Sequence, residues 1–167
     1  MRTILMAVGF TLLASMAYAG VRGAPWVPTW KKDLERIKRL ANLQEGERFI
    51  ELGCGNGRVC RYIARETKAQ SAGIELSLLQ WMVAKTMAWR SGTKIFFGDV
   101  FHRDLSKYNV VYMFLMPETY VKLRDKLTRE LPSGARVISY VWPIEGWQIS
   151  HTDHVDGSQD IFVYVKK

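Results

Sequence analysis

The sequence predicts an α/β fold: a doubly wound, mostly parallel sheet that closes with an antiparallel hairpin and is preceded by a hydrophobic N-terminal helix. A glycine-rich run, residues 53–57, separates a short apolar segment from one whose apolar positions recur every three to four residues. This order is typical of strand, turn and helix. Segments of the two kinds then alternate along the chain, which favours a parallel sheet covered on both faces. Two strand-like runs near the C-terminus indicate the hairpin.

The predicted N-terminal helix is long and apolar enough to cross a membrane. Residues 3–21 contain no ionisable side chain except Tyr18. As an α-helix they would extend about 28 Å, close to the roughly 30 Å of a hydrocarbon core. We therefore divide the chain into a membrane anchor, residues 1–22, and a folded domain, residues 23–167.

A cleaved signal peptide is the alternative, because Ala17-Tyr18-Ala19 resembles a cleavage site. Two features favour an uncleaved anchor with the domain in the cytoplasm. Only Arg2 and the amino terminus are positive before the apolar segment, whereas a basic cluster follows it. A nucleotide-like cofactor is also supplied in the cytosol. The basic cluster consists of Arg22, Lys31, Lys32, Arg36, Lys38 and Arg39.

Composition excludes several classes of protein. With 167 residues, 48% hydrophobic and 24% charged, the chain suits one globular domain rather than a disordered segment or a disulfide scaffold. Cys54 and Cys60 lie in one strand–turn–helix unit, so we expect reduced thiols. The net charge of +8 suits a solvated helix face or anionic lipid headgroups. No aromatic RNA-binding signature accompanies it, so we expect no nucleic-acid partner.

The first half of the domain begins with a short helix that Thr29 is expected to cap, with one apolar stripe. The stripe comprises Trp30, Leu34, Ile37 and Ala41. A strand at 48–52, a helix at 58–66 and a strand at 71–75 follow. Ser77 should cap the next helix. We expect its inner face to carry Leu79, Met82, Val83, Thr86 and Met87.

The second half continues the alternation. Strands are expected at 94–97, 110–114 and 136–141, with a helix that begins at Pro117. The inward residues of that helix should be Tyr120, Leu123, Leu127 and Leu131. Residues 147–165 should form two strands joined at 154–157.

Three acids lie at the predicted carboxyl ends of strands, where open parallel sheets bind their ligands. Glu51 ends the first strand and could organise the glycine loop or receive a ligand's ammonium group. Glu75 ends the second strand, and a carboxylate can accept hydrogen bonds from both hydroxyls of a ribose. Asp99 follows the third strand and is placed to meet an adenine amino group. With Gly53, Gly55 and Gly57, these acids are the predicted cofactor-binding residues.

The spacing of the glycines favours S-adenosylmethionine over NAD. A dinucleotide fingerprint needs its third glycine one residue later, where this chain has Arg58. It also does not include an acid two residues before the first glycine, the position of Glu51.

Taken together, these motifs resemble class I (seven-β-strand, Rossmann-like) S-adenosylmethionine-dependent methyltransferases over residues 23–167. A narrower similarity is to small membrane-anchored protein-lysine methyltransferases related to the mitochondrial enzymes that modify the adenine nucleotide translocase and the c subunit of ATP synthase. It rests on three segments: Pro25-Trp26-Val27-Pro28-Thr29, Ala88-Trp89-Arg90 and Ala135-Arg136-Val137-Ile138-Ser139-Tyr140-Val141-Trp142-Pro143 followed by Trp147. This resemblance implies methylation of a lysine in a membrane protein.

The chain departs from the broader class in two places. Met113-Phe114-Leu115-Met116-Pro117-Glu118 replaces the Asn/Asp-Pro-Pro-Tyr motif of many amine-modifying members. Residues 143–147 are too few for a helix between the fifth and sixth strands, which suggests a more open substrate groove.

Catalytic residues are not assigned by the sequence. An apolar pocket would lower the pKa of a lysine amine, and Trp26, Pro28, Trp142 and Trp147 are candidates for its lining. Thr29 and Glu118 are candidate acceptors for the amine's hydrogens, although helix capping and helix-start charge explain them equally well. The histidines and acids at 151–156 are interpreted as a solvated hairpin, so no metal site is expected.

Three alternative functions stay open at this point. The chain could methylate a lipid or small molecule, act as an NAD-dependent oxidoreductase, or serve as a non-catalytic cofactor-binding membrane adaptor.

Overall fold

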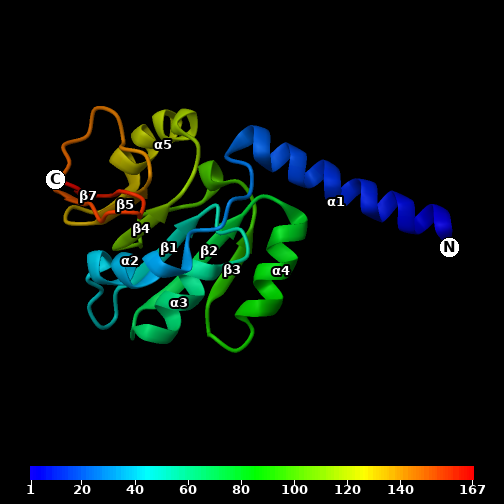
Figure 1. Ribbon diagram of the computed structural model, residues 1–167, viewed down its shortest axis with the longest axis horizontal. Helices are drawn as coiled ribbons and strands as arrows, with labels where there is room; N and C mark the ends of the chain where they lie inside the picture. Colours follow the sequence, from blue (N-terminus) through cyan, green and yellow to red (C-terminus); the bar gives the residue numbers. More distant parts are fainter.

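One seven-stranded sheet organises the domain, in the order β3-β2-β1-β4-β5-β7-β6 (Figure 1). A computed structural model describes residues 1–167. The strands are β1 (Arg48–Leu52), β2 (Gln70–Glu75), β3 (Lys94–Phe97), β4 (Val110–Met113), β5 (Arg136–Tyr140), β6 (His151–Asp153) and β7 (Ile161–Val165). β1 pairs in parallel with β2 and β4, and β7 pairs antiparallel with β5 and β6. The predicted fold class is confirmed.

Helices cover both faces of the sheet. The covering helices are α2 (Leu34–Ala41), α3 (Arg58–Glu66), α4 (Leu78–Ala88) and α5 (Pro117–Glu130). The chain also has α1 (Arg2–Arg22) and the short 3₁₀ turns η1 (Lys31–Asp33) and η2 (Val100–His102). Alternate residues of β1 divide the core: Phe49 packs with α2, α3 and α4, whereas Ile50 and Leu52 pack with α5. This alternation follows from the two-residue period of a strand.

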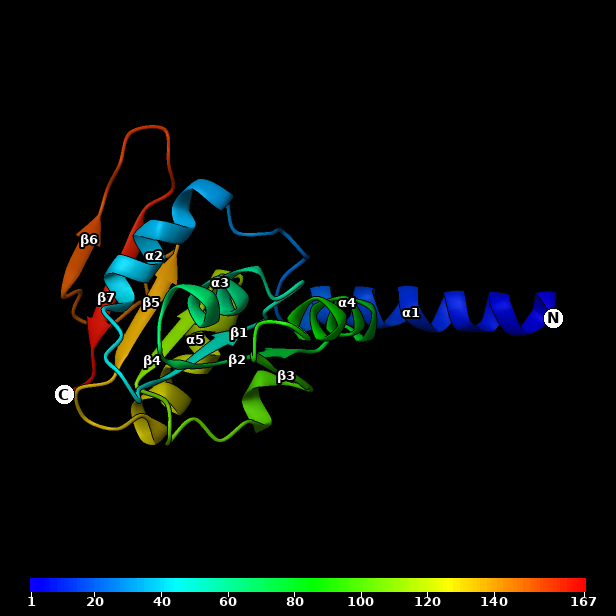
Figure 2. The ribbon, with the colours of Figure 1, turned by 90° about the horizontal axis from the view of Figure 1, so that it is seen from below.

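α1 is a single long helix that projects from the domain, so that the N-terminus lies far from the sheet (Figures 1 and 2). It is long and apolar enough to cross a membrane. Its C-terminal part packs beside α4, and the backbone N–H of Leu78 donates to Oγ of Ser15 at 2.7 Å. The helix is therefore attached to the domain at the start of α4.

The prediction for the inner face of α4 was wrong. Ser77 caps the helix as expected, since its hydroxyl accepts from the N–H of Gln80. The buried residues are Gln80, Ala84 and Ala88, on the opposite side from the expected stripe. Because α4 is apolar on all sides, its periodicity cannot show which side meets the sheet.

The capping role predicted for Thr29 was also wrong. η1 precedes α2 without a side-chain cap, and the Thr29 hydroxyl is hydrogen-bonded to the hydroxyl of Tyr112 at 2.8 Å instead. Trp30 does not join the buried stripe, because it stays 44% exposed. Leu34, Ile37 and Ala41 are buried as predicted.

Gly73 of β2 gives space to two thiols. A Cβ at this position would lie 2.8 Å from Sγ of Cys54 and 3.1 Å from Sγ of Cys60. Both cysteines are buried and free. The glycine loop can therefore pack directly against β2.

Candidate methyl-donor and acceptor sites

The candidate site lies at the carboxyl ends of β1, β2 and β4. Strand order reverses between β1 and β4, and ligands of open α/β sheets bind beside such a point. The glycine loop leaves β1 here. The N–H groups of Gly53 and Cys54 both donate to the carbonyl of Ile74, at 3.0 and 2.9 Å, which holds the loop against β2.

The three glycines of the loop have different surroundings. All have positive φ, a conformation that favours glycine. Gly53 and Gly55 line the pocket at the rim. A Cβ on Gly55 would lie 2.6 Å from Nε1 of Trp26, so the indole lies directly over the loop. Gly57 precedes α3 and faces the core beside Cys60 and Ala84 rather than the pocket.

Glu75 is buried at the end of β2 and uses both carboxylate oxygens. Oε2 accepts from the N–H of Gly55 at 2.7 Å, and Oε1 accepts from the N–H of Ser77 at 2.8 Å. Burial raises the pKa of the carboxyl group, and the N–H donors offset part of that rise. Each oxygen retains acceptor capacity toward the pocket, because a carboxylate offers about four lone-pair sites.

Asp99 lines the same pocket. Oδ1 accepts from the N–H of Phe101 at 3.0 Å, and Oδ2 accepts from Nη2 of Arg22 at 3.1 Å. Arg22 ends α1, and Met16 and Ala19 of the same helix also line the pocket. Sequence reasoning did not place the N-terminal helix at this site, because nothing in its apolar composition indicates a contact with the glycine loop.

Glu51 lies below the loop in a smaller adjoining pocket, together with Trp26, Pro28 and Thr29. Its Oε2 accepts from the N–H of Cys60 at 2.9 Å, which ties β1 to α3. Burial raises the pKa of Glu51 to about 8. The carboxyl group is therefore largely protonated at neutral pH when no cation lies beside it.

A second, mostly apolar pocket opens beside the donor-side pocket. It is lined by Ala24, Pro25, Val27, Trp30, Phe114, Leu115, Met116, Tyr140, Val141, Trp142 and Gln159. The ring of Phe114 packs edge-on against Tyr140, with centroids 4.9 Å apart. Phe114 and Tyr140 were missed by sequence reasoning. Their positions at the carboxyl ends of β4 and β5 are a signal that could have identified them.

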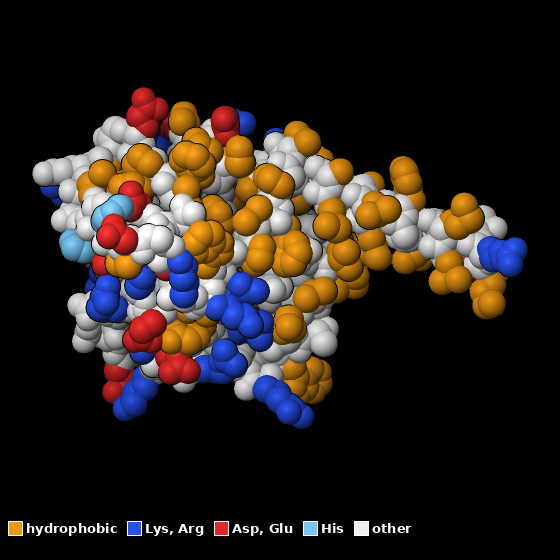
Figure 3. All heavy atoms as spheres, viewed as in Figure 1, with side chains coloured by type: hydrophobic (Ala, Val, Ile, Leu, Met, Phe, Trp, Pro, Cys, Tyr) orange, Lys and Arg blue, Asp and Glu red, His pale blue; other side chains and the backbone are white.

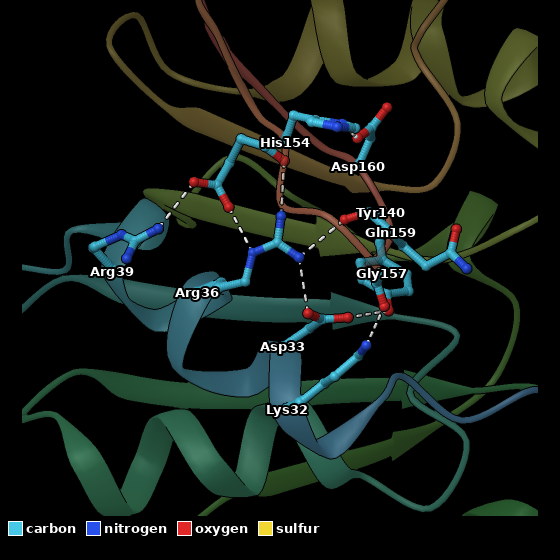
Figure 4. Close-up of polar contacts among 10 residues, drawn as sticks. Lys32, Asp33, Arg36, Arg39, Tyr140, His154, Gly157, Gln159 and Asp160 are labelled. Carbon is cyan, nitrogen blue, oxygen red and sulfur yellow. Dashed lines mark hydrogen bonds and ion pairs between the residues drawn. The ribbon is translucent and has the colours of Figure 1, made fainter.

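An ion-pair cluster holds Tyr140 in place beneath this pocket (Figure 4). The Tyr140 hydroxyl donates to Oδ2 of Asp33 at 2.6 Å, and Oδ1 of Asp33 accepts from Arg36 at 2.8 Å. Arg36 also donates to Oδ2 of Asp153 at 2.6 Å and to the carbonyl of Gln159 at 3.0 Å. The cluster therefore connects α2 to the hairpin of β6 and β7.

Other predicted residues lie elsewhere. Trp147 packs against Tyr164, with ring centroids 5.8 Å apart, and lines a surface hollow near the C-terminus instead of joining Trp26 and Trp142. Glu118 is exposed at the start of α5 and lines none of the pockets described above. In the hairpin, Asp153 pairs with arginines and His154 pairs with Asp160.

Comparisons with known proteins identify the family. The ANTKMT methyltransferase domain matches residues 51–151, from Glu51 at the glycine loop to the start of β6. The chain belongs to this methyltransferase family. It is 31% identical over 147 residues to a protein-lysine N-methyltransferase of Saccharolobus islandicus (strain REY15A), covering 84% of this chain and 91% of that protein.

A human relative and a solved structure agree with the assignment. The Homo sapiens lysine N-methyltransferase named for the C subunit of ATP synthase is 33% identical over 140 residues, which are 80% of this chain but only 57% of the human protein. The crystal structure of an RNA methyltransferase from Salinibacter ruber in complex with S-adenosyl-L-homocysteine superposes with a TM-score of 0.79 at 29% identity. It covers 83% of this chain and 93% of that one.

This ANTKMT-family chain is thus an S-adenosylmethionine-dependent methyltransferase. The assignment decides against a nicotinamide-dependent oxidoreductase. The geometry fits the donor: the glycine loop is open to the pocket at Gly53 and Gly55, and a buried carboxylate that lines the same pocket has spare acceptor sites, as the binding of a diol requires.

Proposed function

We propose that this methyltransferase modifies the side-chain amine of a lysine in a membrane-associated protein, with α1 as a retained anchor and the domain on the cytoplasmic side. One structural observation carries the proposal. The donor-side pocket and the apolar pocket share Ala24, Pro25, Val27, Phe114 and Leu115 as lining residues. An acceptor amine in the apolar pocket would therefore lie next to the methyl donor, with only these shared side chains bordering both.

The donor-side residues have distinct roles in this proposal. When bound, S-adenosylmethionine supplies a methyl group from its sulfonium. Gly53 and Gly55 allow close approach to the loop, Glu75 accepts from the ribose hydroxyls, and Asp99 accepts from the adenine amino group. Glu51 lies nearest the loop's underside and interacts with the ammonium group of the donor, while Gly57 sets the start of α3.

The acceptor side favours a neutral amine. A lysine has an ordinary pKa near 10.4 and must lose a proton before it can attack. Burial against Phe114, Tyr140 and Trp142 disfavours the charged form and lowers that pKa. Alignment and exclusion of water then supply much of the rate enhancement. Trp26 borders the donor-side pocket and the adjoining small pocket, and Pro28 and Thr29 line the latter.

Two observations support a retained anchor. Met16, Ala19 and Arg22 of α1 line the donor-side pocket, so cleavage after Ala19 would remove part of its wall. The basic residues that follow α1 favour retention of the domain in the cytoplasm. The names of the relatives support a protein lysine as acceptor, and for the human relative a lysine of the ATP synthase C subunit.

The test uses the full chain in lipid vesicles with methyl-labelled S-adenosylmethionine and a membrane-protein fraction. We expect label in protein, on lysine after hydrolysis, and the mass of one or more methyl groups on intact substrate. Membranes whose lysine amines were acetylated beforehand are the matched control and should take up no label. Label in the lipid fraction, or in a small molecule other than the donor itself, would instead support the alternative acceptor and overturn the lysine proposal.

A further inference from the structure

The outer face of α4 is an unusual surface for a domain in water. Five large apolar side chains lie on this face, and four of them are more than a third exposed. They are Leu79, Met82 (37%), Val83 (38%), Met87 (49%) and, just beyond the helix, Trp89 (88%). α4 contains no acidic residue, and Lys85 is its single charge. A helix that is apolar on every side is typical of a buried or lipid-contacting position.

The position of α4 relates this face to α1. In both ribbon views α4 lies at the edge of the domain nearest the free end of α1 and runs across the direction of α1 (Figures 1 and 2). Figure 3 shows apolar side chains continuing from α1 onto the adjoining edge of the domain. A membrane that receives α1 would therefore meet α4 first.

The short free part of α1 favours a second contact with the membrane. Leu12, Ser15, Met16 and Ala19 are half-buried against the domain, whereas all residues up to Thr11 except Gly9 are exposed. The free segment, residues 2–11, extends about 15 Å, roughly half of the hydrocarbon core. An interfacial helix immersed by about 5–10 Å would bring further apolar surface to the bilayer. α4 is the element in the right place to do so.

Charges beside α4 match an anionic headgroup layer. Lys85 on α4 and Arg90, just beyond the C-terminal end of α4, are exposed, and Arg65 is exposed on the neighbouring α3. The exposed Trp89 suits the boundary between headgroups and acyl chains, where tryptophan side chains concentrate. Basic flanks and an apolar centre are the pattern of interfacial helices.

We propose that α4 lies flat in the bilayer interface, with Met82, Val83 and Trp89 in contact with lipid, while α1 is inserted beside it. The proposal rests on the membrane anchor of the proposed function and goes beyond it by assigning a second membrane contact. It fixes the orientation of the domain, because α1 is inserted into the bilayer while α4 lies parallel to its surface, and the two helices run in different directions. The donor-side pocket, lined by α1, then opens close to the membrane surface.

The experiment places an environment-sensitive fluorophore at Met82→Cys in the full chain, in vesicles with and without brominated acyl chains. The native cysteines are buried and should not be labelled. The matched control is Val121→Cys on α5, whose residue is 49% exposed, compared with 37% for Met82. We expect bromine to quench the fluorophore at position 82 at least severalfold more than the one at position 121.

The outcomes separate this inference from the proposed anchor. Binding to the vesicles is measured by flotation in a density gradient. If the chain floats with the vesicles but the fluorophore at position 82 is quenched no more than the one at position 121, α4 does not contact lipid and the inference is wrong. If the chain does not float with the vesicles, the anchor and the inference both fail. Protection of position 82 in detergent, together with crosslinking between copies, would assign the face to a dimer and overturn lipid contact. Quenching lost on Val83→Glu, with flotation retained, would support the proposal.

Discussion

Nη2 of Arg22, the last residue of α1, donates a hydrogen bond to Oδ2 of Asp99, the acid that follows β3, at 3.1 Å. Both residues line the donor-side pocket. The pair therefore connects the apolar N-terminal helix to the position proposed for the adenine amino group. A movement of α1 that breaks this hydrogen bond would free Oδ2 of Asp99 to accept from another donor.

We expect Arg22→Ala to strengthen binding of S-adenosylmethionine, because Oδ2 of Asp99 would no longer be shared with the guanidinium. Calorimetry of the full chain in detergent micelles measures the change. Arg22→Lys retains the positive charge and should bind like the unaltered chain. Weaker binding by Arg22→Ala would mean that the pair holds Asp99 in its binding orientation, contrary to this prediction.

Glu75→Gln should weaken donor binding by about tenfold or more, since a hydrogen bond to a charged group contributes roughly 1.5–3 kcal/mol. The glutamine has one oxygen acceptor for the two N–H groups that Glu75 now satisfies, so the temperature midpoint of unfolding should also fall. Binding is therefore measured well below that midpoint. Glu118→Gln, which changes an exposed acid outside the pockets, is the control for binding and should leave the affinity for the donor unchanged. Unaltered affinity in Glu75→Gln would exclude the ribose role.

The buried carboxyl of Glu51 predicts a pH dependence of stability. Its pKa is raised from an ordinary 4.5 to about 8 by burial, so the folded chain holds this proton more tightly than the unfolded chain. The contribution to stability is complete below pH 4.5 and is lost as the pH rises to about 8. Glu51→Gln cannot ionise and should remove this part of the pH dependence. Urea unfolding at several pH values between 5 and 9 compares the two chains, and parallel curves would contradict the prediction.

Arg36→Leu should destabilise the domain by about 3–5 kcal/mol, because it leaves the buried Asp33 and the largely buried Asp153 without their shared cation. Burial acts to raise the pKa of Asp153, but the hydrogen bond and charge of Arg36 hold it below its ordinary value. Arg39→Leu removes a more exposed partner of the same acid and should have a much smaller effect. Urea denaturation measures both, and equal losses would show that Arg36 is not the centre of the cluster.

Local sequence signals predicted much of the fold. The bounds of β1, α3 and β3 were confirmed, because the glycine loop and polar turns limit these short elements on both sides. The cap at Ser77 was confirmed for the same local reason. Glu75 and Asp99 were brought to one pocket because parallel strands share a carboxyl edge.

Contacts between elements that are distant in the chain could not be predicted from the sequence. The apolar stripe of α4 was identified correctly as a set of residues that share a face, but it was assigned to the wrong side. Thr29 could cap a helix or bond to a distant tyrosine, and only the packing of β4 decides between them. Trp147 carried no signal to distinguish a pocket lining from its contact with Tyr164.

The missing side chain at Gly73 constrains how this chain can diverge. Because Cβ and Sγ of Cys54 and Sγ of Cys60 occupy the volume that a methyl group would need there, alanine at 73 requires both cysteine side chains to move. A substitution at one of the positions 54, 60 and 73 should therefore depend on which residues occupy the other two. Loss of the thiols alone would not make room for a side chain at 73, since Cβ of residue 54 would still lie 2.8 Å away, so the loop itself would have to shift.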